Sequence, residues 1–253
     1  MSRPVALVTG AASGIGAASA RLLARDGAFV YCADRDGPGA GSVAAEIGSA
    51  SAAQLWLDVT DEAAWATAMQ TILEAGHLLS VLVHAAGISA AGTVRNTTLA
   101  EWRRVLAVNL DGAFLATRHG IEAMHQQGGA IVLVGSASGI RPAAGAVAYS
   151  ASKAGLAMLA RTAAKECRDA GVPVRVNVVS PGGVKTPLWR AMPFFQELVA
   201  QHGSDDAAFA ALAGSGPAFA TAEDVAQVIG FLVSPAAAQI TGVELPVDAG
   251  YVL

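Results

Sequence analysis

The segment TGAASGIG, residues 9–16, decides the fold of this chain of 253 residues. It follows the apolar run VALVTG (5–10) and opens a segment with helical spacing. A short apolar run that ends in glycine is typical of a strand buried on both faces of a parallel sheet. Gly10, Gly14 and Gly16 would let the backbone approach a pyrophosphate at the helix N-terminus, where free N–H groups bind anions. The alternative interpretation is a tight strand-to-helix turn that binds nothing.

Strand and helix patterns alternate along most of the chain. Strands are expected at 5–10, 28–34, 53–59, 79–87, 129–138, 174–183 and 242–248, and helices at 14–27, 38–47, 61–75, 98–126, 147–170 and 221–233. This alternation predicts an α/β fold with right-handed crossovers, in which helices cover both faces of a parallel sheet. We see no internal repeat and no linker of low complexity, so we expect a single domain over residues 1–253.

One region, 186–220, breaks the alternation. Prolines and glycines surround its short helical pieces, at Pro187, Pro193, Gly203, Gly214, Gly216 and Pro217. A long insertion between a strand and a helix is often a substrate lid in enzymes. We therefore expect residues 186–220 to form such a lid.

Composition excludes several classes of protein. The net charge is -4 and only 14% of the residues are charged, so nothing favours nucleic acid or an anionic membrane as a partner. No apolar segment has the length needed to span a bilayer, and the apolar run near the start is too short for a signal peptide. Cys32 and Cys167 form no metal or redox motif, and no histidine spacing indicates a metal site. We expect a cytoplasmic protein.

An acidic residue stands where a dinucleotide-binding fold contacts the ribose of its cofactor. Asp34 ends the second predicted strand, at a typical distance from Gly16. An acidic side chain there accepts hydrogen bonds from the ribose hydroxyls and repels a 2′-phosphate, which favours NAD over NADP. Arg35 is the competing signal, because a guanidinium could tolerate the phosphate, whereas Ser13 adds no positive charge. Asp58, near the end of the third strand, could accept a hydrogen bond from the adenine amino group.

A tyrosine and a lysine stand one helical turn apart in AYSASKAGLAML, residues 148–159. The side chains of Tyr149 and Lys153 therefore leave the same face of a helix that is otherwise small or apolar. Ser136 comes at the end of the fifth strand, at the edge where parallel sheets bind ligands. Asn109 lies inside the long predicted helix, where asparagine has poor propensity. We predict that these four side chains are catalytic.

This set suits the interconversion of a secondary alcohol and a ketone. The reaction needs a proton donor or a base at the oxygen atom, and a free phenol, with a pKa of about 10, is a poor base near neutrality. The ammonium of Lys153 and the positive nicotinamide ring would stabilise the phenolate of Tyr149, and each unit of lowering represents about 1.4 kcal/mol. Ser136 would orient the substrate oxygen, and Asn109 would hold a water that links Lys153 to solvent.

These motifs, taken in order, resemble the short-chain dehydrogenase/reductase family over the whole chain. The family patterns are present as TGAASGIG (9–16), Asn109, Ser136, YSASK (149–153), SPGGVKTP (180–187) and ITGVELPVDAG (240–250). The resemblance implies a doubly wound Rossmann fold with a seven-stranded parallel sheet in three αβα layers, and it implies a homotetramer. It also implies that the backbone of Val184 and the hydroxyl of Thr186 meet the carboxamide of the nicotinamide.

The expected cofactor contacts follow from these motifs. They comprise Gly10, Ser13, Gly14, Ile15, Gly16, Asp34, Arg35, Asp58, Val59, Ala85, Ala86, Gly87, Tyr149, Lys153, Pro181, Gly182, Val184 and Thr186. One departure concerns the loop after the fourth strand, where the family usually has N-N-A-G and this chain has HAAG (84–87). The backbone role of that loop should survive. His84 either ties neighbouring strands together or is a core histidine whose hydrogen bonds are satisfied.

The substrate pocket is expected to be largely apolar. Its predicted lining is Ser138, Ile140, Ala143, Gly183, Trp189, Met192 and Phe195, from the loop after the fifth strand and from the lid region. The pattern is similar to that of bacterial hydroxysteroid and cyclic-alcohol dehydrogenases of the family, which implies a steroid-like or alicyclic substrate. Two alternatives stay open. The lid aromatics could pack on the protein or on a neighbouring subunit, and Arg141 and Arg190 could anchor a carboxylate.

We therefore predict an enzyme that interconverts a secondary alcohol and a ketone by hydride transfer with NAD(H), with Tyr149 as general acid and base. One alternative is an NADPH-dependent reductase of 3-oxoacyl-carrier-protein or of another ketone, which Asp34 disfavours. An alternative from another class is a dinucleotide-sensing protein without turnover. Such a protein should have lost part of the set Ser136, Tyr149 and Lys153.

Overall fold

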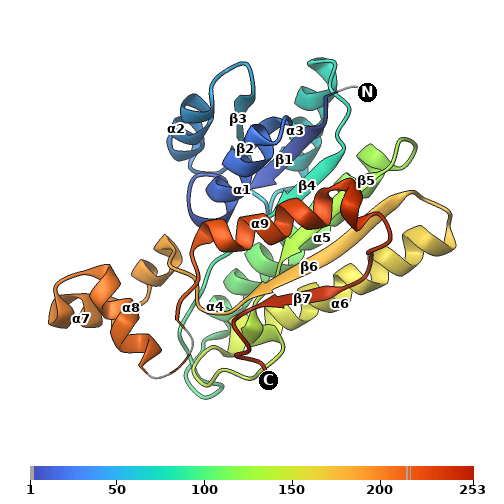
Figure 1. Cartoon of the computed structure of the whole chain (residues 1–253). Helices are drawn as coiled ribbons and strands as arrows, with labels where there is room; N and C mark the ends of the chain where they lie inside the picture. The colour runs from blue at the N-terminus through green and yellow to red at the C-terminus, as the bar shows by residue number, and fades with distance from the viewer. Residues whose placement is uncertain (1–2, 215, 217) are drawn as a thin grey trace.

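Seven parallel strands form the central sheet of the computed structural model, which describes residues 3–214, 216 and 218–253 (Figure 1). The strands are β1 (Val5–Thr9), β2 (Phe29–Asp34), β3 (Ala52–Trp56), β4 (Val81–His84), β5 (Gly129–Val134), β6 (Val174–Pro181) and β7 (Glu244–Val247). They lie in the order β3-β2-β1-β4-β5-β6-β7, and each neighbouring pair is parallel. The strand order reverses between β1 and β4, which opens a crevice at their carboxyl ends. The predicted doubly wound fold is confirmed.

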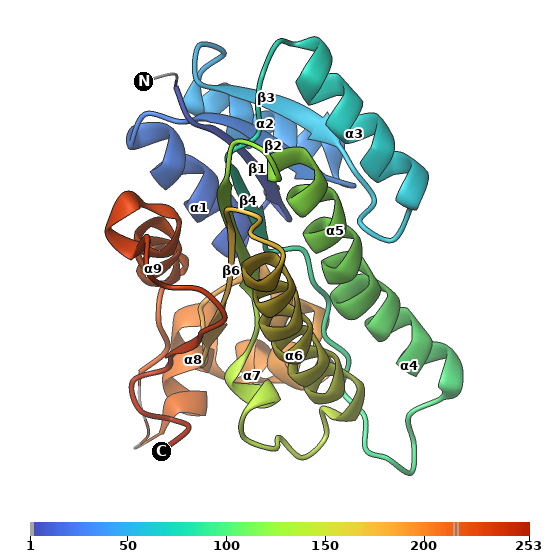
Figure 2. The same ribbon diagram turned by 90° about the vertical axis from the view of Figure 1, so that its right-hand side faces the viewer.

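Helices cover both faces of the sheet (Figure 2). They are α1 (Gly14–Arg25), α2 (Gly37–Ile47), α3 (Glu62–Glu74), α4 (Leu99–Leu106), α5 (Gly112–Met124), α6 (Val147–Asp169), α7 (Pro193–His202), α8 (Asp205–Ala213) and α9 (Ala222–Val233). Helices α1, α2 and α9 cover one face, where their apolar side chains, such as Ile229 of α9, pack with Val8 of β1 in one core. Helices α3, α5 and α6 cover the other face, where Leu156 of α6 and Leu7 of β1 belong to a second core. In the described part of the chain, none of the helices combines the length and apolarity of a membrane-spanning segment.

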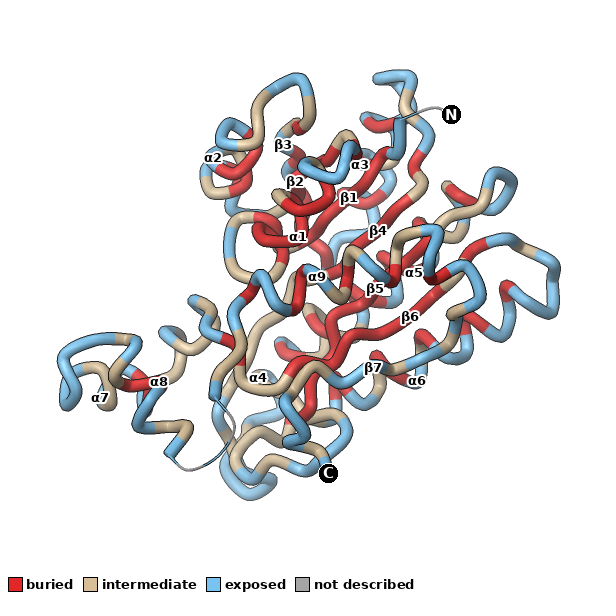
Figure 3. The backbone as a smooth tube through the Cα atoms, in the orientation of Figure 1, coloured by how far each residue is buried: buried red, intermediate tan, exposed pale blue. Residues whose placement is uncertain are grey.

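The central strands are buried because their sequences are apolar without interruption. Every residue of β1 and of β4 is buried, and Figure 3 shows the same pattern along the middle of the sheet. Successive side chains point to opposite faces, so Leu7 and Val8 enter different cores. Full burial of one such side chain stabilises the fold by about 1.5–3 kcal/mol. The carboxyl ends of these strands are therefore rigid supports for the loops that follow them.

The long helix predicted over 98–126 divides into three pieces. A π-helical turn, η1 (Ala107–Asp111), separates α4 from α5. Such turns are rare and frequently occur at functional sites. This one carries Asn109, which is fully buried.

Three predicted strands, over 53–59, 79–87 and 129–138, are longer than the observed β3, β4 and β5. Beyond the observed carboxyl ends, Leu57, Ala85 and Gly135 each donate one last backbone hydrogen bond to a neighbouring strand. Residues 57–59, 85–87 and 135–136 then line the cleft described below.

The region 186–220, which we call the lid, folds mainly into three helical pieces that project from the sheet (Figure 1). These pieces are η3 (Pro187–Ala191), α7 and α8. Phe195 and Phe209 are buried between them, with ring centroids 4.7 Å apart. The lid therefore has an apolar core of its own. Residue 215 and Pro217 lie outside the described residues.

The turn after β1 packs closely against the loop after β4. Gly10 has a φ of +69°, and a Cβ there would lie 2.7 Å from the backbone nitrogen of Ala86 and 2.9 Å from the carbonyl carbon of Ala85. Only a residue without a side chain fits this approach and tolerates this conformation. The contact joins the two loops that form the crevice.

We predict that Gly10→Ala destabilises the protein more than Gly171→Ala. Both glycines have a φ of +69°, so alanine adds a backbone strain of about 1–2 kcal/mol at either position. A Cβ at Gly171 meets nothing within 4 Å, whereas at Gly10 it would collide with the backbone of Ala86. This overpacking should cost Gly10→Ala about 1–3 kcal/mol more in the free energy of unfolding, measured with urea. Equal losses in the two variants would contradict the close approach.

Candidate active site

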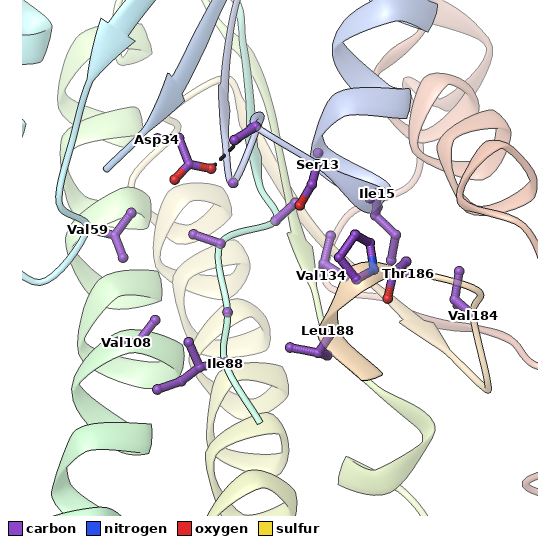
Figure 4. Close-up of a pocket in the computed structure, with 18 of the residues that line it drawn as sticks. Ser13, Ile15, Asp34, Val59, Ile88, Val108, Val134, Val184, Thr186 and Leu188 are labelled. Atoms are coloured by element: carbon purple, nitrogen blue, oxygen red, sulfur yellow. Dashed lines mark hydrogen bonds between the residues drawn. The ribbon is translucent and has the colours of Figure 1, made fainter. Parts of the chain in front are cut away.

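A cleft of about 460 Å³ lies at the carboxyl ends of the strands (Figure 4). Its wall includes every residue that the sequence predicts to contact the cofactor, together with Ser136 and Trp189. The sequence did not predict the lining residues Ala12, Asp36, Leu57, Ile88, Val108, Val134, Gly135, Pro187 and Leu188. Each of them lies within two positions of a predicted site residue, so including the two residues on either side of each predicted position would have found them.

The N-terminus of α1 reaches the cleft with its backbone donors uncapped. Ser13 occupies the N-cap position, its side chain makes no capping hydrogen bond, and the first turn carries no acidic residue. The first N–H groups of a helix have no partner within the helix and form the positive end of its dipole. The glycine-rich turn and this helix end therefore fit an anion such as a pyrophosphate.

Two carboxylates lie at one end of the cleft, and Figure 4 shows Asp34 there. Asp34 Oδ2 accepts a hydrogen bond from the backbone N–H of Ala12 at 3.1 Å, and Oδ1 accepts one from Asp36 at 3.0 Å. Asp36 caps α2 by accepting from the backbone N–H of Gly39 at 3.0 Å. Asp34 therefore stabilises the local turn and also places negative charge on the cleft wall.

Asp58 is a third acidic residue of the wall. It accepts hydrogen bonds from the backbone N–H of Thr60 at 2.9 Å and from the Thr60 hydroxyl at 2.8 Å. The backbone bond lowers the pKa of Asp58 most, and the charge of Arg35 acts in the same direction. The carboxylate stays ionised and can accept a further hydrogen bond from a ligand.

The ammonium of Lys153 lies almost completely inside the protein. Lys153 is 5% exposed, and its Nζ donates a hydrogen bond of 2.7 Å to the carbonyl oxygen of Val134. Burial lowers the pKa of Lys153 to about 8, because the charged form loses its solvation. The Nζ atom lies 5.7 Å from the centre of the Tyr149 ring.

Tyr149 departs from the expected electrostatics. Burial raises the pKa of Tyr149, and a hydrogen bond with the hydroxyl of Ser136 opposes that effect. In the protein alone the pKa of this phenol therefore lies above its ordinary value, and the lowering expected from Lys153 together with the nicotinamide ring stays a prediction. The phenol therefore keeps its proton at neutral pH and is a proton donor in this state.

A local turn holds Ser136 beside Tyr149. Ser136 precedes the short 3-10 helix η2 (Ala137–Gly139), and its Oγ accepts a hydrogen bond from the backbone N–H of Ser138 at 3.1 Å. A hydroxyl that accepts one bond keeps its hydrogen for another partner. Ser136 can therefore donate to an oxygen atom in the cleft.

Asn109 does not line the cleft, and both hydrogens of its amide are already used. Its Nδ2 donates to the carbonyl oxygen of Ile88 at 2.9 Å and to Ser152 Oγ at 3.0 Å, and its Oδ1 accepts from the N–H of Ile88 at 2.8 Å. Ser152 Oγ in turn donates to the carbonyl oxygen of Tyr149 at 2.7 Å. The side chain therefore joins the loop after β4 to the turn of α6 that carries Tyr149. The expectation that Asn109 also holds a water linking Lys153 to solvent stays a prediction.

The predicted substrate residues are only partly brought together. Trp189 lines the cleft, whereas Ser138, Ile140, Ala143, Gly183 and Met192 are not part of its wall. The prediction for Phe195 is wrong, because this side chain is fully buried in the core of the lid. The alternative in which lid aromatics pack on the protein itself therefore holds for Phe195.

The two arginines considered as carboxylate anchors already have partners. Arg141 donates to the carbonyl oxygen of Tyr251 at 2.6 Å and lies over its ring, 4.9 Å from the centroid. Arg190 donates to Asp205 Oδ2 at 2.7 Å. Neither guanidinium lines the cleft.

The chain is similar to known proteins along its whole length. A family model described as "Enoyl-(Acyl carrier protein) reductase" matches residues 10–252. The chain is 41% identical to a cis-4-hydroxycyclohexanecarboxylate dehydrogenase of Sinomonas cyclohexanicum, over 98% of this chain and 96% of that protein. It is 38% identical to a cyclopentanol dehydrogenase of Comamonas sp. (strain NCIMB 9872), over 98% of this chain and 96% of that protein.

A solved structure agrees with these relatives. The 3-ketoacyl-(acyl-carrier-protein) reductase from Brucella melitensis complexed with NADH has a TM-score of 0.85 and 30% identity, covering 99% of this chain and 98% of that chain. The fold, the cleft and these similarities lead to one assignment. The chain belongs to the short-chain dehydrogenase/reductase family, whose members are oxidoreductases that use a nicotinamide dinucleotide.

Proposed function

We propose that this chain interconverts a neutral cyclic secondary alcohol and its ketone, with NAD as the cofactor. The observation that carries the proposal is that Ser136, Tyr149 and Lys153 line the same cleft as the glycine-rich turn and Asp34. The names of the two relatives, which act on a hydroxylated cyclohexane acid and on cyclopentanol, support a ring-shaped substrate.

Each member of the set has a role that its surroundings favour. Tyr149 is the proposed general acid and base, since its protonated phenol can give a proton to a ketone oxygen and recover it from the alcohol. Ser136 is proposed to donate a hydrogen bond to the same oxygen, which stabilises negative charge that develops there. Lys153 is proposed to hold the ribose of the cofactor and to favour the phenolate form of Tyr149. When bound, the nicotinamide supplies or accepts the hydride.

The remaining cleft residues are proposed to hold the cofactor. The glycine-rich turn and the uncapped start of α1 fit the pyrophosphate, and Asp34 fits the adenosine ribose. The backbone of Val184 and the hydroxyl of Thr186 are proposed to bind the carboxamide. Asn109 is proposed as a positioning residue, because its hydrogen bonds join the loop after β4 to α6.

The preference for NAD is supported by two acids rather than one. Asp36 lines the cleft beside Asp34, and both carboxylates would repel a 2′-phosphate on the ribose. Arg35 lines the same wall, but its charge also acts on Asp58. Negative charge therefore predominates at this end of the cleft.

A neutral substrate is supported by the engaged arginines. Burying a carboxylate without a partner is costly. Arg141 and Arg190 are paired with Tyr251 and Asp205, outside the cleft wall. The cleft wall that includes Tyr149 also carries the apolar side chains of Ile88, Val108, Leu188 and Trp189, among others.

We also propose that the chain is one domain with a movable lid and forms a cytoplasmic homotetramer. Apolar side chains stay exposed on α5 and α6, at Phe114 and Met158, and on α9 and β7, at Phe231 and Leu245. These faces offer apolar surface for contacts between subunits. Cys32 and Cys167 are free thiols, which suits a reducing compartment.

We expect Tyr149→Phe to abolish turnover and to leave NADH binding nearly intact, because only the proton donor is removed. The kcat should fall by at least about 100-fold, and the Kd for NADH should be followed by fluorescence titration. Tyr251→Phe is the matched control, since Tyr251 is 43% exposed and lies outside the cleft. Retained turnover in Tyr149→Phe would overturn the mechanism.

The double variant Asp34→Asn/Asp36→Asn should relax cofactor discrimination. Each asparagine keeps one oxygen, which can accept from the N–H of Ala12 or of Gly39, and both charges are removed. Asp34→Asn gives up only the second bond, from the N–H of Asp36. The ratio of the Kd for NADPH to the Kd for NADH should fall by at least about tenfold, equivalent to about 1.4 kcal/mol. Asp26→Asn, at the exposed pair with Arg25, is the control. A wild-type protein that prefers NADPH would contradict the proposal.

Cyclohexanol should be a better substrate than cis-4-hydroxycyclohexanecarboxylate. We expect a kcat/KM at least about tenfold higher for the neutral alcohol, because the acid would bury an unpaired charge. Initial rates of NADH formation measure both. An equal or higher kcat/KM for the acid would show that a cation reaches the cleft, and Arg141→Gln and Arg190→Gln would then identify it.

A further inference from the structure

A layer of buried polar side chains lies at the carboxyl ends of the central strands. It comprises Thr9, His84, Asn109, Ser136, Ser152 and Lys153, each of which is at most 9% exposed. Most of their polar atoms have partners within the protein, as the bonds of Asn109, Ser152 and Lys153 show. Among the described residues of this layer, Nε2 of His84 has no hydrogen-bond partner, although its side chain is fully buried.

His84 lies on the same face of the sheet as Lys153. It pairs in register with Thr9 of β1 and with Leu133 of β5. Leu133 belongs to the core shared with α5 and α6, so the ring of His84 faces these helices. The next residue of β5, Val134, accepts the hydrogen bond from Lys153.

The hydrogen bonds around Thr9 determine which nitrogen of His84 carries the hydrogen. Thr9 Oγ1 lies 3.0 Å from His84 Nδ1 and accepts a hydrogen bond from the backbone N–H of Ala86 at 3.3 Å. If the Thr9 hydroxyl donates to Nδ1, every polar atom of this pair except Nε2 has a partner. If Nδ1 carried the hydrogen and donated to Thr9, both Nε2 and the hydroxyl hydrogen of Thr9 would be without a partner. The geometry therefore assigns the hydrogen to Nε2.

His84 and Lys153 then both place hydrogen-bond donors in this buried layer. Nε2–H of His84 has no acceptor, and the ammonium of Lys153 has three donors but one protein acceptor, the carbonyl of Val134. Buried donors need acceptors, and two donors cannot bond to each other. Gly87 lies against this layer, since a Cβ at this position would lie 3.5 Å from Lys153 Nζ and 3.3 Å from Asn109 Oδ1.

We propose that Nε2–H of His84 holds a buried water against the ammonium of Lys153, so that His84 is a positioning residue for that lysine. A water oxygen accepts both hydrogen bonds and carries two hydrogens for nearby acceptors, which is the usual environment of a buried water. The importance of this contact for turnover rests on the proposed role of Lys153. Its existence does not depend on that role.

The charges around His84 agree with this arrangement. Burial, and to a smaller extent the charge of Lys153, lowers the pKa of His84 to about 3. β1 presents the uncharged Thr9 and β5 presents the apolar Leu133, so Lys153 is the charged group that acts on the ring. His84 stays neutral and acts as a donor rather than as a proton carrier.

A pair of substitutions separates the two nitrogens of the ring. In His84→Gln the amide nitrogen reaches about as far as Nε2, whereas in His84→Asn it reaches only as far as Nδ1 and can still bond to Thr9. His84→Asn should therefore lose the water, and His84→Gln should keep it. His119→Gln is the matched control, because His119 also has a buried Nε2 without a partner but stacks on Trp65, away from the cleft.

The titration of Lys153 is the main measurement, followed by NMR of the full chain with ¹³C-labelled lysine. The chain has three lysines, Lys153, Lys165 and Lys185, so single Arg variants of the last two assign the spectrum. His84→Asn should lower the pKa of Lys153 by about one unit, because the ammonium loses a hydrogen-bond partner. His84→Gln and His119→Gln should leave it unchanged. An unchanged titration in His84→Asn would overturn the proposal.

A second measurement needs no variant. Nitrogen-15 NMR of the imidazoles in the wild-type chain should show His84 neutral with its hydrogen on Nε2 down to pH 5. A hydrogen on Nδ1 would overturn the proposal even if both His84 variants failed to fold.

The pH profile of alcohol oxidation links the contact to the reaction. In His84→Asn the acid limb of kcat should move to higher pH, because a less stable ammonium stabilises the phenolate of Tyr149 less. The expected NMR results without alcohol turnover in the wild type would refute the proposed function and leave the His84 contact standing. Alcohol turnover in the wild type, together with an unchanged titration of Lys153 in His84→Asn, would support the proposed function and refute the His84 contact.

Discussion

The approach of Gly10 to the backbone of Ala85 and Ala86 is the constraint on which the rest of the site depends. It joins the loops after β1 and β4, the neighbouring strands at which the order of the sheet reverses. Because the two loops touch, Thr9 can receive the N–H of Ala86 and also contact His84. The same contact fixes the start of α1 at the cleft. A larger residue at Gly10 would separate the two loops that carry these groups.

The charges of the cleft are separated along its length. Carboxylates lie at the end formed by β2, and a buried ammonium lies where α6 meets the carboxyl end of β5. Holding Lys153 at 5% exposure costs stability once the pH falls below the ordinary pKa of lysine, and the full cost is reached below its lowered pKa of about 8. One carbonyl offsets only part of that cost. Such local costs are common where a site needs a charge in a dry environment. Burial of the apolar cores on both faces of the sheet offsets the cost of the buried ammonium.

The sequence predicts the fold and the outline of the cleft better than the details of the site. Alternating apolar segments and the glycine-rich turn are local signals, so the strand positions and the cofactor-side wall follow from them. The orientation of side chains is not local. Three features depend on how β4, β5 and α6 meet: the partners of Asn109, the carbonyl that accepts from Lys153 and the partial burial of Tyr149. The sequence also gives no sign that Phe195 is buried, because an aromatic residue in a lid has the same local pattern whether it faces a ligand or the core of the lid.

The separate aromatic core of the lid has a consequence for how this protein can change. Trp189, Phe195 and Phe209 pack mainly on one another and on lid neighbours rather than on the sheet. Insertions or exchanges within 186–220 can therefore be accommodated inside the lid, without repacking the strands that carry the reactive groups. The lid is thus built so that its own sequence can vary while the positions of Ser136, Tyr149 and Lys153 stay the same.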